Sequence, residues 1–317
     1  MSFASVPLLD LSRSLEQQIC DFASSEPITA LFQRFGIVDD DRLSPVERMR
    51  ALEAQSDQWD FRGGGERNLA AGVEFDGHTT SLVLDVVRSL GMVEASQPNR
   101  RDVDHVLILG GLVRACFSRP AAAAALLNSG LLRSSSVVAL GGFRALNGDE
   151  LDLAAEIGSS HLGDEFDAME KGVRDAFDLT DAPAISDEGE DSDLIGGAWR
   201  IRVLPGGDPT LRVVAAPSSE PELRRANSAD TFSWFAEREL VPGSSVLLLT
   251  SAIYVPFQHC DAIRTLALPF GVQVDIVGVD TRLLAPPLGQ QFATHNYLQE
   301  IRSTLRSYRM LAESLRS

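Results

Sequence analysis

Apolar positions along the chain follow a helical period at first and a strand period later. In residues 1–100 the pattern is mostly helical. Ser44-Pro45-Val46-Glu47 combines a capping box with proline at the first helical position, which predicts a helix to about Ala54. A second helix is predicted from about Thr79 to Leu90. These patterns predict a helical N-terminal region, residues 1–100, ahead of a domain of another kind.

After residue 100, short apolar runs alternate with helical stretches. The runs predicted as strands are His105–Leu109, Val137–Leu140, Val246–Leu249 and Val272–Val277. The predicted helices are Pro120–Leu127, Asp164–Phe177, Ser228–Glu239, Asp261–Leu268 and a closing Tyr297–Leu315. Such alternation implies parallel strands joined by right-handed crossovers. The expected fold class is therefore α/β: a Rossmann-like, mainly parallel sheet flanked by helices in residues 101–317, with a helical N-terminal extension and a C-terminal helix.

Residues 185–215 read as an insertion in that domain. Trp199–Leu204 and Leu211–Ala215 flank a turn rich in glycine and proline, which predicts a β-hairpin. The acidic stretch Asp187–Asp193 has few apolar residues and is expected to be a solvated, mobile loop.

Charge and composition narrow the class of partner. The 317-residue chain has a formal net charge of −17, which opposes non-specific binding to nucleic acid. Local arginines can still bind an anionic ligand, because helix N-termini and guanidinium groups act over short distances. The composition leaves open whether the chain forms homo-oligomers.

Other features bear on the compartment and on metals. No apolar run approaches the roughly 20 residues that a membrane helix needs. The N-terminus lacks the basic and apolar regions of a secretory signal. The three cysteines are widely spaced, and neither they nor the five histidines have the spacing of a metal site. We therefore expect a cytoplasmic protein without a membrane segment and without a structural metal.

Candidate chemistry lies where predicted parallel strands end, since ligands bind outside the carboxyl ends of such strands. Gly110-Gly111 and Gly141-Gly142 each follow a strand, with Arg114 and Arg144 close behind, and Thr250-Ser251 ends a third strand. Paired glycines let backbone approach a ligand and expose N–H groups to an anion. The alternative is that the glycines only turn the chain tightly. Neither GxGxxG nor a P-loop occurs.

Three further segments are candidates. Polar residues from Arg224 to Thr231 precede or open a predicted helix, where free N–H groups and the helix dipole favour anions. Glu165 opens another helix, and in both places simple helix capping is the alternative. The loop Trp59–Asn68 mixes aromatic, charged and glycine residues, as lids over ligands do, although it also fits a plain surface loop. Its candidate lid residues are Trp59, Arg62, Glu66 and Arg67.

Taken together, these motifs resemble the YdcF-like family, which includes the SanA and ElyC envelope proteins. The similar segments, spanning roughly residues 104–280, are Val106–Gly111 with Arg119, Val138–Gly142, Asp164–Met169, Asn227–Thr231, and Leu248–Ser251 with Pro256. The resemblance implies a Rossmann-like fold and, from YdcF itself, S-adenosylmethionine or another adenosine-type ligand. The sequence departs from the family where Tyr254 and Phe257 stand at about the places of a histidine and an arginine. The membrane anchor of the envelope members is also absent from the sequence.

The leading hypothesis is a small-molecule site for a nucleotide-like or phosphorylated ligand, with group-transfer or hydrolytic chemistry in bacterial metabolism, specialised metabolism included. Asp230 and Glu165 are the expected general bases. The expected ligand-binding residues are Gly110, Gly111, Arg114, Arg119, Gly141, Gly142, Arg144, Arg225, Asn227, Ser228, Thr231, Thr250, Ser251 and Tyr254. Loss of Arg119 or Asp230 is expected to abolish ligand binding or turnover without unfolding the protein. The alternative hypothesis is a non-catalytic S-adenosylmethionine- or nucleotide-binding module that regulates a protein partner.

Overall fold

Two compact units make up the chain, and the computed structural model describes residues 2–37, 40, 42–61, 72–179, 183–191 and 197–316 of them. The helical unit comprises residues 1–94, 252–264 and 291–317, and the sheet unit comprises residues 95–251 and 265–290. The boundary near residue 95 lies close to the expected one at residue 100. The C-terminal helix, which the sequence placed in the Rossmann-like domain, belongs to the helical unit instead.

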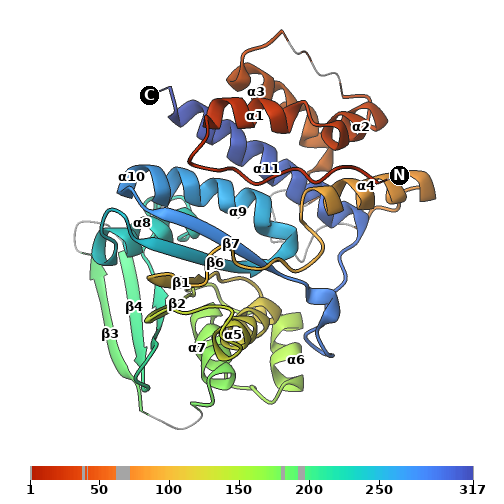
Figure 1. Ribbon diagram of the computed structural model, residues 1–317. Coiled ribbons are helices and arrows are strands. Elements are labelled where there is room, and N and C mark those ends of the chain that lie inside the picture. The colour runs from red at the N-terminus through yellow and green to blue at the C-terminus, as the bar shows by residue number, and fades with distance from the viewer. Residues whose placement is uncertain are drawn as a thin grey trace. The chain divides into compact units, whose positions relative to one another are not determined.

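The helical unit is built around its longest helix. Its elements are α1 (Leu15–Ala23), α2 (Glu26–Arg34), α3 (Pro45–Gln55), the 3-10 turn η1 (Ser56–Trp59), α4 (Gly77–Ser89), the 3-10 turn η3 (Ala252–Tyr254), α9 (Val255–Ala262) and α11 (Thr294–Ser314) (Figure 1). The 21-residue α11 packs against α1, α3, α4 and α9. The capping box predicted at Ser44 and Glu47 is present at the start of α3. Aromatic rings fill the core, with Phe22 stacked on Tyr308 at a centroid distance of 4.3 Å.

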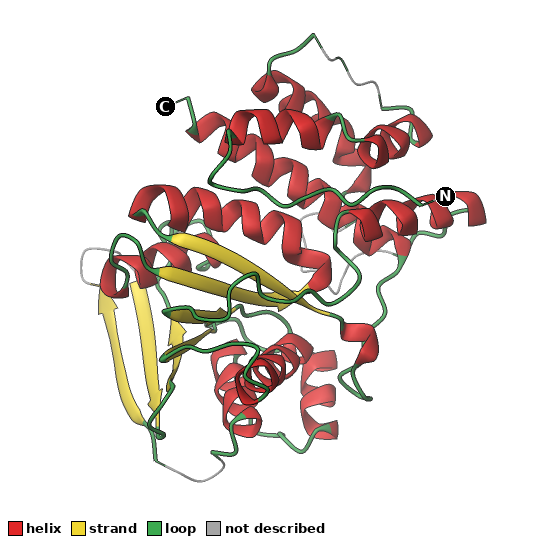
Figure 2. Ribbon diagram, in the orientation of Figure 1, coloured by secondary structure: helices red, strands yellow, loops and turns green. Residues whose placement is uncertain are grey.

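A seven-stranded mixed sheet forms the centre of the sheet unit (Figure 2). The strands are β1 (His105–Ile108), β2 (Ser136–Leu140), β3 (Ile185–Asp191), β4 (Gly197–Leu204), β5 (Thr210–Ala215), β6 (Ser245–Ser251) and β7 (Gln273–Val279), in the order β3-β4-β5-β2-β1-β6-β7. The five strands from β5 to β7 are parallel, while β3 and β4 extend one edge in antiparallel pairing. This is the predicted α/β class, and the parallel strands follow the Rossmann order, in which the chain builds outward from β1 first on one side and then on the other.

Helices cover both faces of this sheet. They are α5 (Val113–Asn128), α6 (Gly148–Glu156), α7 (Glu165–Ala176), α8 (Ser228–Glu239) and the short α10 (Leu268–Phe270), with a 3-10 turn η5 at Thr281–Leu283. Val106 and Ile108 of β1 belong to the core under α5 and α7. His105, on the alternate face of the strand, contacts the ring of Phe235 in α8 at 5.6 Å. Figure 1 shows α5, α6 and α7 gathered on the first of these faces.

The contact between α5 and α7 is close because one residue in it has no side chain. A Cβ atom on Gly172 of α7 would lie 1.9 Å from the carbonyl oxygen of Cys116 in α5. Only glycine allows this approach, which lets α7 pack closely against α5 at this point.

Several predicted elements differ in extent. The hairpin predicted from Trp199 to Ala215 is confirmed as β4 and β5. The expected mobile acidic loop is wrong for residues 187–191, which form the edge strand β3, because β4 supplies backbone partners and Arg200 pairs with Glu188 at 3.1 Å. The helix predicted at Asp261–Leu268 instead starts at Val255 and passes through a π-helical turn at Ile263–Ala267 into α10. Helix α6 was not predicted.

Candidate functional site

The carboxyl ends of β1 and β6 lie side by side where the strand order reverses direction. From β1 the chain proceeds through β2 to β5, then returns to place β6 on the other side of β1. Connections therefore leave these two strand ends in opposite directions, which opens a crevice in sheets of this order. Gly110 and Gly111 follow β1 here, and Thr250 and Ser251 end β6.

Glu165, the first residue of α7, lies against both glycine pairs. A Cβ atom on Gly110 would lie 2.3 Å from Oε1 of Glu165, and one on Gly142 would lie 3.6 Å from its Oε2. Backbone hydrogen bonds also join the start of α7 to the segment after β2. The N–H of Glu165 donates to the carbonyl of Arg144 at 2.9 Å, and the N–H of Phe166 donates to the carbonyl of Gly142 at 3.0 Å. The glycines thus admit a carboxyl group of the protein itself between the ends of β1 and β2.

Burial and nearby arginines act in opposite directions on the pKa of Glu165. Burial raises its pKa above the ordinary value of 4.5. Three guanidinium groups oppose this rise without cancelling it, those of Arg144, Arg225 and Arg119. A carboxyl group with a raised pKa, in a site at a sheet's carboxyl edge, is suited to give and take protons closer to neutral pH.

Arg144 is committed mainly to a second carboxylate, that of Glu150 in α6. Its guanidinium donates to both Glu150 oxygens, at 2.6 and 2.8 Å, and to the carbonyl of Gly111 at 3.1 Å, while its Nε lies 3.4 Å from Oε2 of Glu165. Glu150 in turn accepts the N–H of Val113 in the first turn of α5 at 3.0 Å. Burial raises the Glu150 pKa, but Arg144 and backbone donors outweigh burial and lower it overall.

Glu150 was not predicted as a site residue, although the sequence around it contains a recognisable capping pattern. Asn147 and Glu150 form a capping box at the start of α6, a pattern that can be read from Asn followed three residues later by Glu. A buried carboxylate at the N-terminus of α5 means that part of this positive helix end is already neutralised by the protein.

Arg119 has a different role from the one expected. Its side chain is only 1% exposed, and its guanidinium donates to the carbonyls of Leu109 at 2.6 Å and Gly110 at 2.5 Å. It also donates to Oγ of Ser251 at 3.3 and 3.4 Å. Arg119 therefore joins the ends of β1 and β6 and shapes the loop that faces Glu165. The geometry disfavours the expected direct pairing with a ligand anion, because the side chain is almost fully buried, its Nη1 donates to two carbonyls, and its Nε and Nη2 donate to Ser251.

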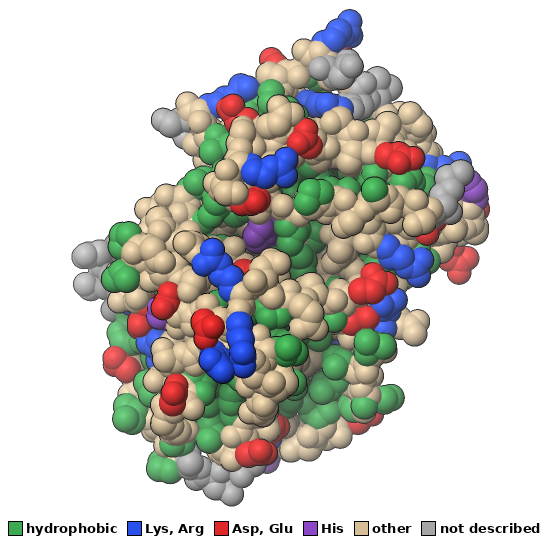
Figure 3. All heavy atoms as spheres, in the orientation of Figure 1, with side chains coloured by type: hydrophobic (Ala, Val, Ile, Leu, Met, Phe, Trp, Pro, Cys, Tyr) green, Lys and Arg blue, Asp and Glu red, His purple; other side chains and the backbone are tan. Residues whose placement is uncertain are grey.

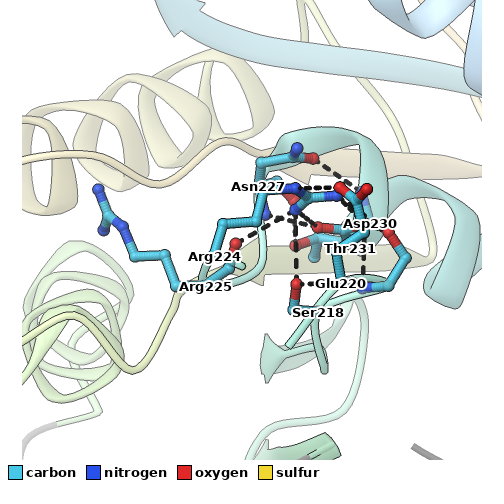
Figure 4. A network of polar contacts seen from close by, with 8 residues as sticks. Ser218, Glu220, Arg224, Arg225, Asn227, Asp230 and Thr231 are labelled. Atoms are coloured by element: carbon cyan, nitrogen blue, oxygen red, sulfur yellow. Dashed lines mark hydrogen bonds and ion pairs between the residues drawn. The ribbon is translucent and has the colours of Figure 1, made fainter. Parts of the chain in front are cut away.

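The second predicted cluster, at the start of α8, is a closed polar network (Figure 4). Asp230 accepts from Oγ of Ser219 at 2.5 Å, from the backbone N–H of Asn227 at 2.9 Å, and from Arg224. Asn227 caps α8 reciprocally, and buried Thr231 donates to the Asn227 carbonyl at 3.1 Å. Ser228 is the first helical residue.

This network argues against Asp230 as a base. Burial raises its pKa, but Arg224, Ser219 and Asn227 outweigh burial and lower the pKa overall. Both oxygens of Asp230 already accept hydrogen bonds, so the carboxylate stabilises the capping loop rather than taking a proton from a ligand. Of the two predicted bases, the geometry favours Glu165.

Asp230→Asn is expected to lower the free energy of unfolding by about 1–3 kcal/mol at pH 7, since a charge-assisted set of hydrogen bonds is lost. A carboxyl whose folded-state pKa is lowered contributes stability that is complete above the ordinary value of 3.8 and is lost as pH falls below it. The difference in the free energy of unfolding between wild type and Asp230→Asn is therefore expected to decrease below about pH 3.8. Urea unfolding at pH 7 and at pH 3 measures it, and a gap that is independent of pH would contradict this role.

Arg225 differs from its neighbour Arg224. Its side chain is exposed and extends away from the Asp230 network, as Figure 4 shows. Its charge acts on Glu165. Arg114, by contrast, is half-buried and donates to the carbonyl of Gly289 at 3.2 Å. Arg225 is thus the arginine of the predicted set best placed to meet a ligand.

Other predicted site residues lie elsewhere. Tyr254 belongs to the helical unit, where its ring meets Phe257 and Phe292 edge to face at 6.0 and 6.3 Å. Trp59 is 1% exposed in the core of the helical unit against Phe35, so this side chain packs a core rather than closing a lid. The remaining candidate lid residues lie outside the described part of the chain: Arg62, Glu66 and Arg67.

Within the described residues, clusters of metal-ligand side chains and membrane-spanning helices are both absent. Within residues 2–37, 40, 42–61, 72–179, 183–191 and 197–316, no three His, Cys, Asp or Glu side chains gather as metal ligands do. In the same part of the chain, no helix combines the length and apolarity needed to cross a membrane. Charged side chains of both signs are interspersed on the face drawn in Figure 3.

Comparison with known proteins places the chain in a family. Residues 10–91, in the helical unit, match the Rv3785 N-terminal domain. The uncharacterized protein Rv3785 of Mycobacterium tuberculosis is 32% identical over 84% of this chain and 81% of its own length. The uncharacterized protein Mb3814 of Mycobacterium bovis gives the same values. No solved structure matches. None of these matches tests the resemblance to the YdcF-like family, which stays a prediction. The chain belongs to the family of the mycobacterial protein Rv3785.

Proposed function

We propose that the sheet unit binds a nucleotide-like or phosphorylated small molecule at the carboxyl ends of β1, β2 and β5, and that Glu165 is the general acid or base of a group-transfer or hydrolytic reaction there. The observation that carries the proposal is the position of Glu165: a mostly buried carboxyl group of raised pKa, set between the glycine pairs that follow β1 and β2, next to the β1–β6 boundary where the strand order reverses.

The local charge supports an anionic ligand. Three arginines act on Glu165, and Glu150, paired with Arg144, adds a second carboxyl group to the same cluster. When Glu165 is protonated the cluster carries a net positive charge, in a chain whose formal net charge is −17. Because electrostatic attraction to a ligand depends on nearby charges more than on distant ones, this cluster favours a phosphate or carboxylate.

The resemblance to the YdcF-like family supports an adenosine-type ligand, S-adenosylmethionine among them. The three cysteines are free and two of them are buried, which fits a reducing compartment, and we place the activity in the cytoplasm.

A non-catalytic binding module is the second candidate. Asp230, one of two predicted bases, is held in a closed network, and Tyr254 stands at about the place of a histidine in many members of the YdcF-like family, which the sequence resembles. Fewer acid–base groups than expected therefore remain for chemistry. In this second candidate, the bound ligand would alter contacts with a protein partner, and the ligand would be released chemically unaltered.

Binding is tested by native mass spectrometry of freshly purified protein, followed by thermal shift with nucleoside monophosphates, S-adenosylmethionine and ribose 5-phosphate. We expect a retained mass or a rise in Tm of about 4–7 °C for a ligand at 100 times its Kd. Overnight incubation of the binder with saturating protein then separates the two candidates, since an enzyme alters the ligand and a module does not. No retained mass and no shift across the panel would contradict both.

A further inference from the structure

An aromatic side chain stands exposed beside Glu165. Phe143 is 40% exposed and lies between Gly142 and Arg144, whose carbonyls accept the N–H groups of Phe166 and Glu165. The backbone on each side of Phe143 is therefore tied to the first turn of α7.

One face of the Phe143 ring is backed by a fixed cation. The guanidinium carbon of Arg200 lies 5.3 Å from the centroid of Phe143 and 5.0 Å from that of Phe166, which is fully buried. Arg200 is held in turn by ion pairs at 3.1 Å to Glu188 and 3.6 Å to Asp164. Phe166, Arg200 and Phe143 thus form a stack that runs from the core to the surface.

The stack lies on the β5 side of Glu165. Arg200 of β4 pairs with Ala215, the last residue of β5, so the ring of Phe143 is displaced from β2 toward β5. Gly110, which touches Glu165, lies on the other side of β2, at the end of β1. A molecule that meets both Glu165 and Phe143 therefore extends along the carboxyl edge of the sheet. Arg225, in the segment between β5 and α8, has a charge that acts on Glu165.

We propose that the ligand carries a heteroaromatic base, which stacks on the outer face of Phe143 while its phosphate or reacting group lies by Glu165. The proposal rests on the small-molecule site proposed above and narrows its ligand to a nucleotide. A ring pre-ordered by the cation behind it offers a large flat contact at little cost in conformational entropy. A sugar phosphate has no ring to fill that face. Stacking tolerates any base, so Phe143 contributes affinity more than base specificity.

Matched ligands and matched variants test the proposal. The ligands are the four nucleoside monophosphates and ribose 5-phosphate, which shares their sugar and phosphate but lacks the base. The variants are Phe143→Ala, Phe143→Leu and Phe143→Trp, with Leu131→Ala as the control for loss of an exposed apolar side chain before the opposite, amino end of β2. Calorimetric titration gives each Kd, and urea unfolding verifies that each variant is folded.

Phe143→Ala and Phe143→Leu are expected to weaken nucleotide binding about 5- to 100-fold and to leave ribose 5-phosphate unaffected. Phe143→Trp is expected to retain or increase nucleotide affinity, and Leu131→Ala to match wild type. Equal affinity of wild type for nucleotides and ribose 5-phosphate, with no effect of Phe143→Ala, would overturn the stacking proposal while the proposed site stands. If none of these ligands binds wild type, the proposed function fails and the stacking proposal fails with it.

Discussion

Arg119→Ala is expected to lower the free energy of unfolding by about 3–5 kcal/mol, enough to remove much of the stability of a typical domain. Two effects add. The variant leaves the carbonyls of Leu109 and Gly110 buried without their charged donor, and it leaves a cavity where the guanidinium and its stem were packed. Because the same side chain reaches Ser251, the ends of β1 and β6 also lose a side-chain connection that adds to their backbone pairing. Urea unfolding monitored by circular dichroism measures the change.

Arg114→Ala is the matched control on the same helix, since Arg114 is half-buried and makes one contact to a carbonyl. It is expected to cost less than about 1 kcal/mol. The loss in free energy of unfolding for Arg119→Lys should lie between those of Arg114→Ala and Arg119→Ala. An ammonium group lacks the planar fork with which a guanidinium reaches both carbonyls and Ser251. An Arg119→Ala protein as stable as wild type that had lost only ligand binding would contradict the structural role and restore the ligand-binding role expected from sequence.

At neutral pH, Glu165→Gln is expected to raise the free energy of unfolding relative to wild type, whereas Asp230→Asn is expected to lower it. A carboxyl group whose folded-state pKa is raised binds its proton more tightly in the folded protein than in the unfolded chain. Wild type therefore loses stability as pH rises from 4.5 through the folded-state pKa, and the glutamine variant lacks this loss. Relative to wild type, the variant should gain stability across that window and keep the gain at higher pH. Unfolding curves from pH 4 to pH 8 measure it.

The same substitution tests catalysis once a turned-over ligand is known. Loss of a general acid or base lowers kcat by about 10²- to 10⁴-fold, while the ligand Kd should change little because glutamine preserves the shape of the side chain. Glu156→Gln, at the exposed end of α6, is the control and should alter neither stability nor rate. Full turnover in Glu165→Gln would assign Glu165 to structure and favour the binding module.

Much of the fold could be predicted from local patterns. Every strand of the parallel set was found at least in part, because buried strands give short apolar runs bounded by glycine or polar residues. The edge strand β3 was missed because its residues are acidic, and its strand form depends on distant partners in β4. The assignment of α11 to the helical unit also depends on long-range packing, which a pattern within the helix does not reveal.

Local features of the sequence indicated which candidate residues lie together but not what each of them contacts. Strand ends and glycine pairs are such features, and Gly110, Gly142, Arg144 and Glu165, which they singled out, lie together in the structure, while their part in a site stays a prediction. Whether an arginine faces a ligand or the protein's own carbonyls depends on burial, which separates Arg119 from Arg225. Whether a carboxylate is a base or a cap depends on its hydrogen bonds, which separate Glu165 from Asp230.

The most direct test of the account is a heteronuclear NMR titration of protein labelled with ¹⁵N only at its 25 glycines. A nucleoside monophosphate found to raise Tm is the titrant, and Gly→Ala variants at exposed positions help to assign the signals. We expect the signals of Gly110, Gly111, Gly141 and Gly142 to shift together and to saturate at one Kd, while the signals of glycines remote from the carboxyl edge of the sheet do not shift. Saturable binding that moves only other glycines, with these four unmoved, would contradict the site.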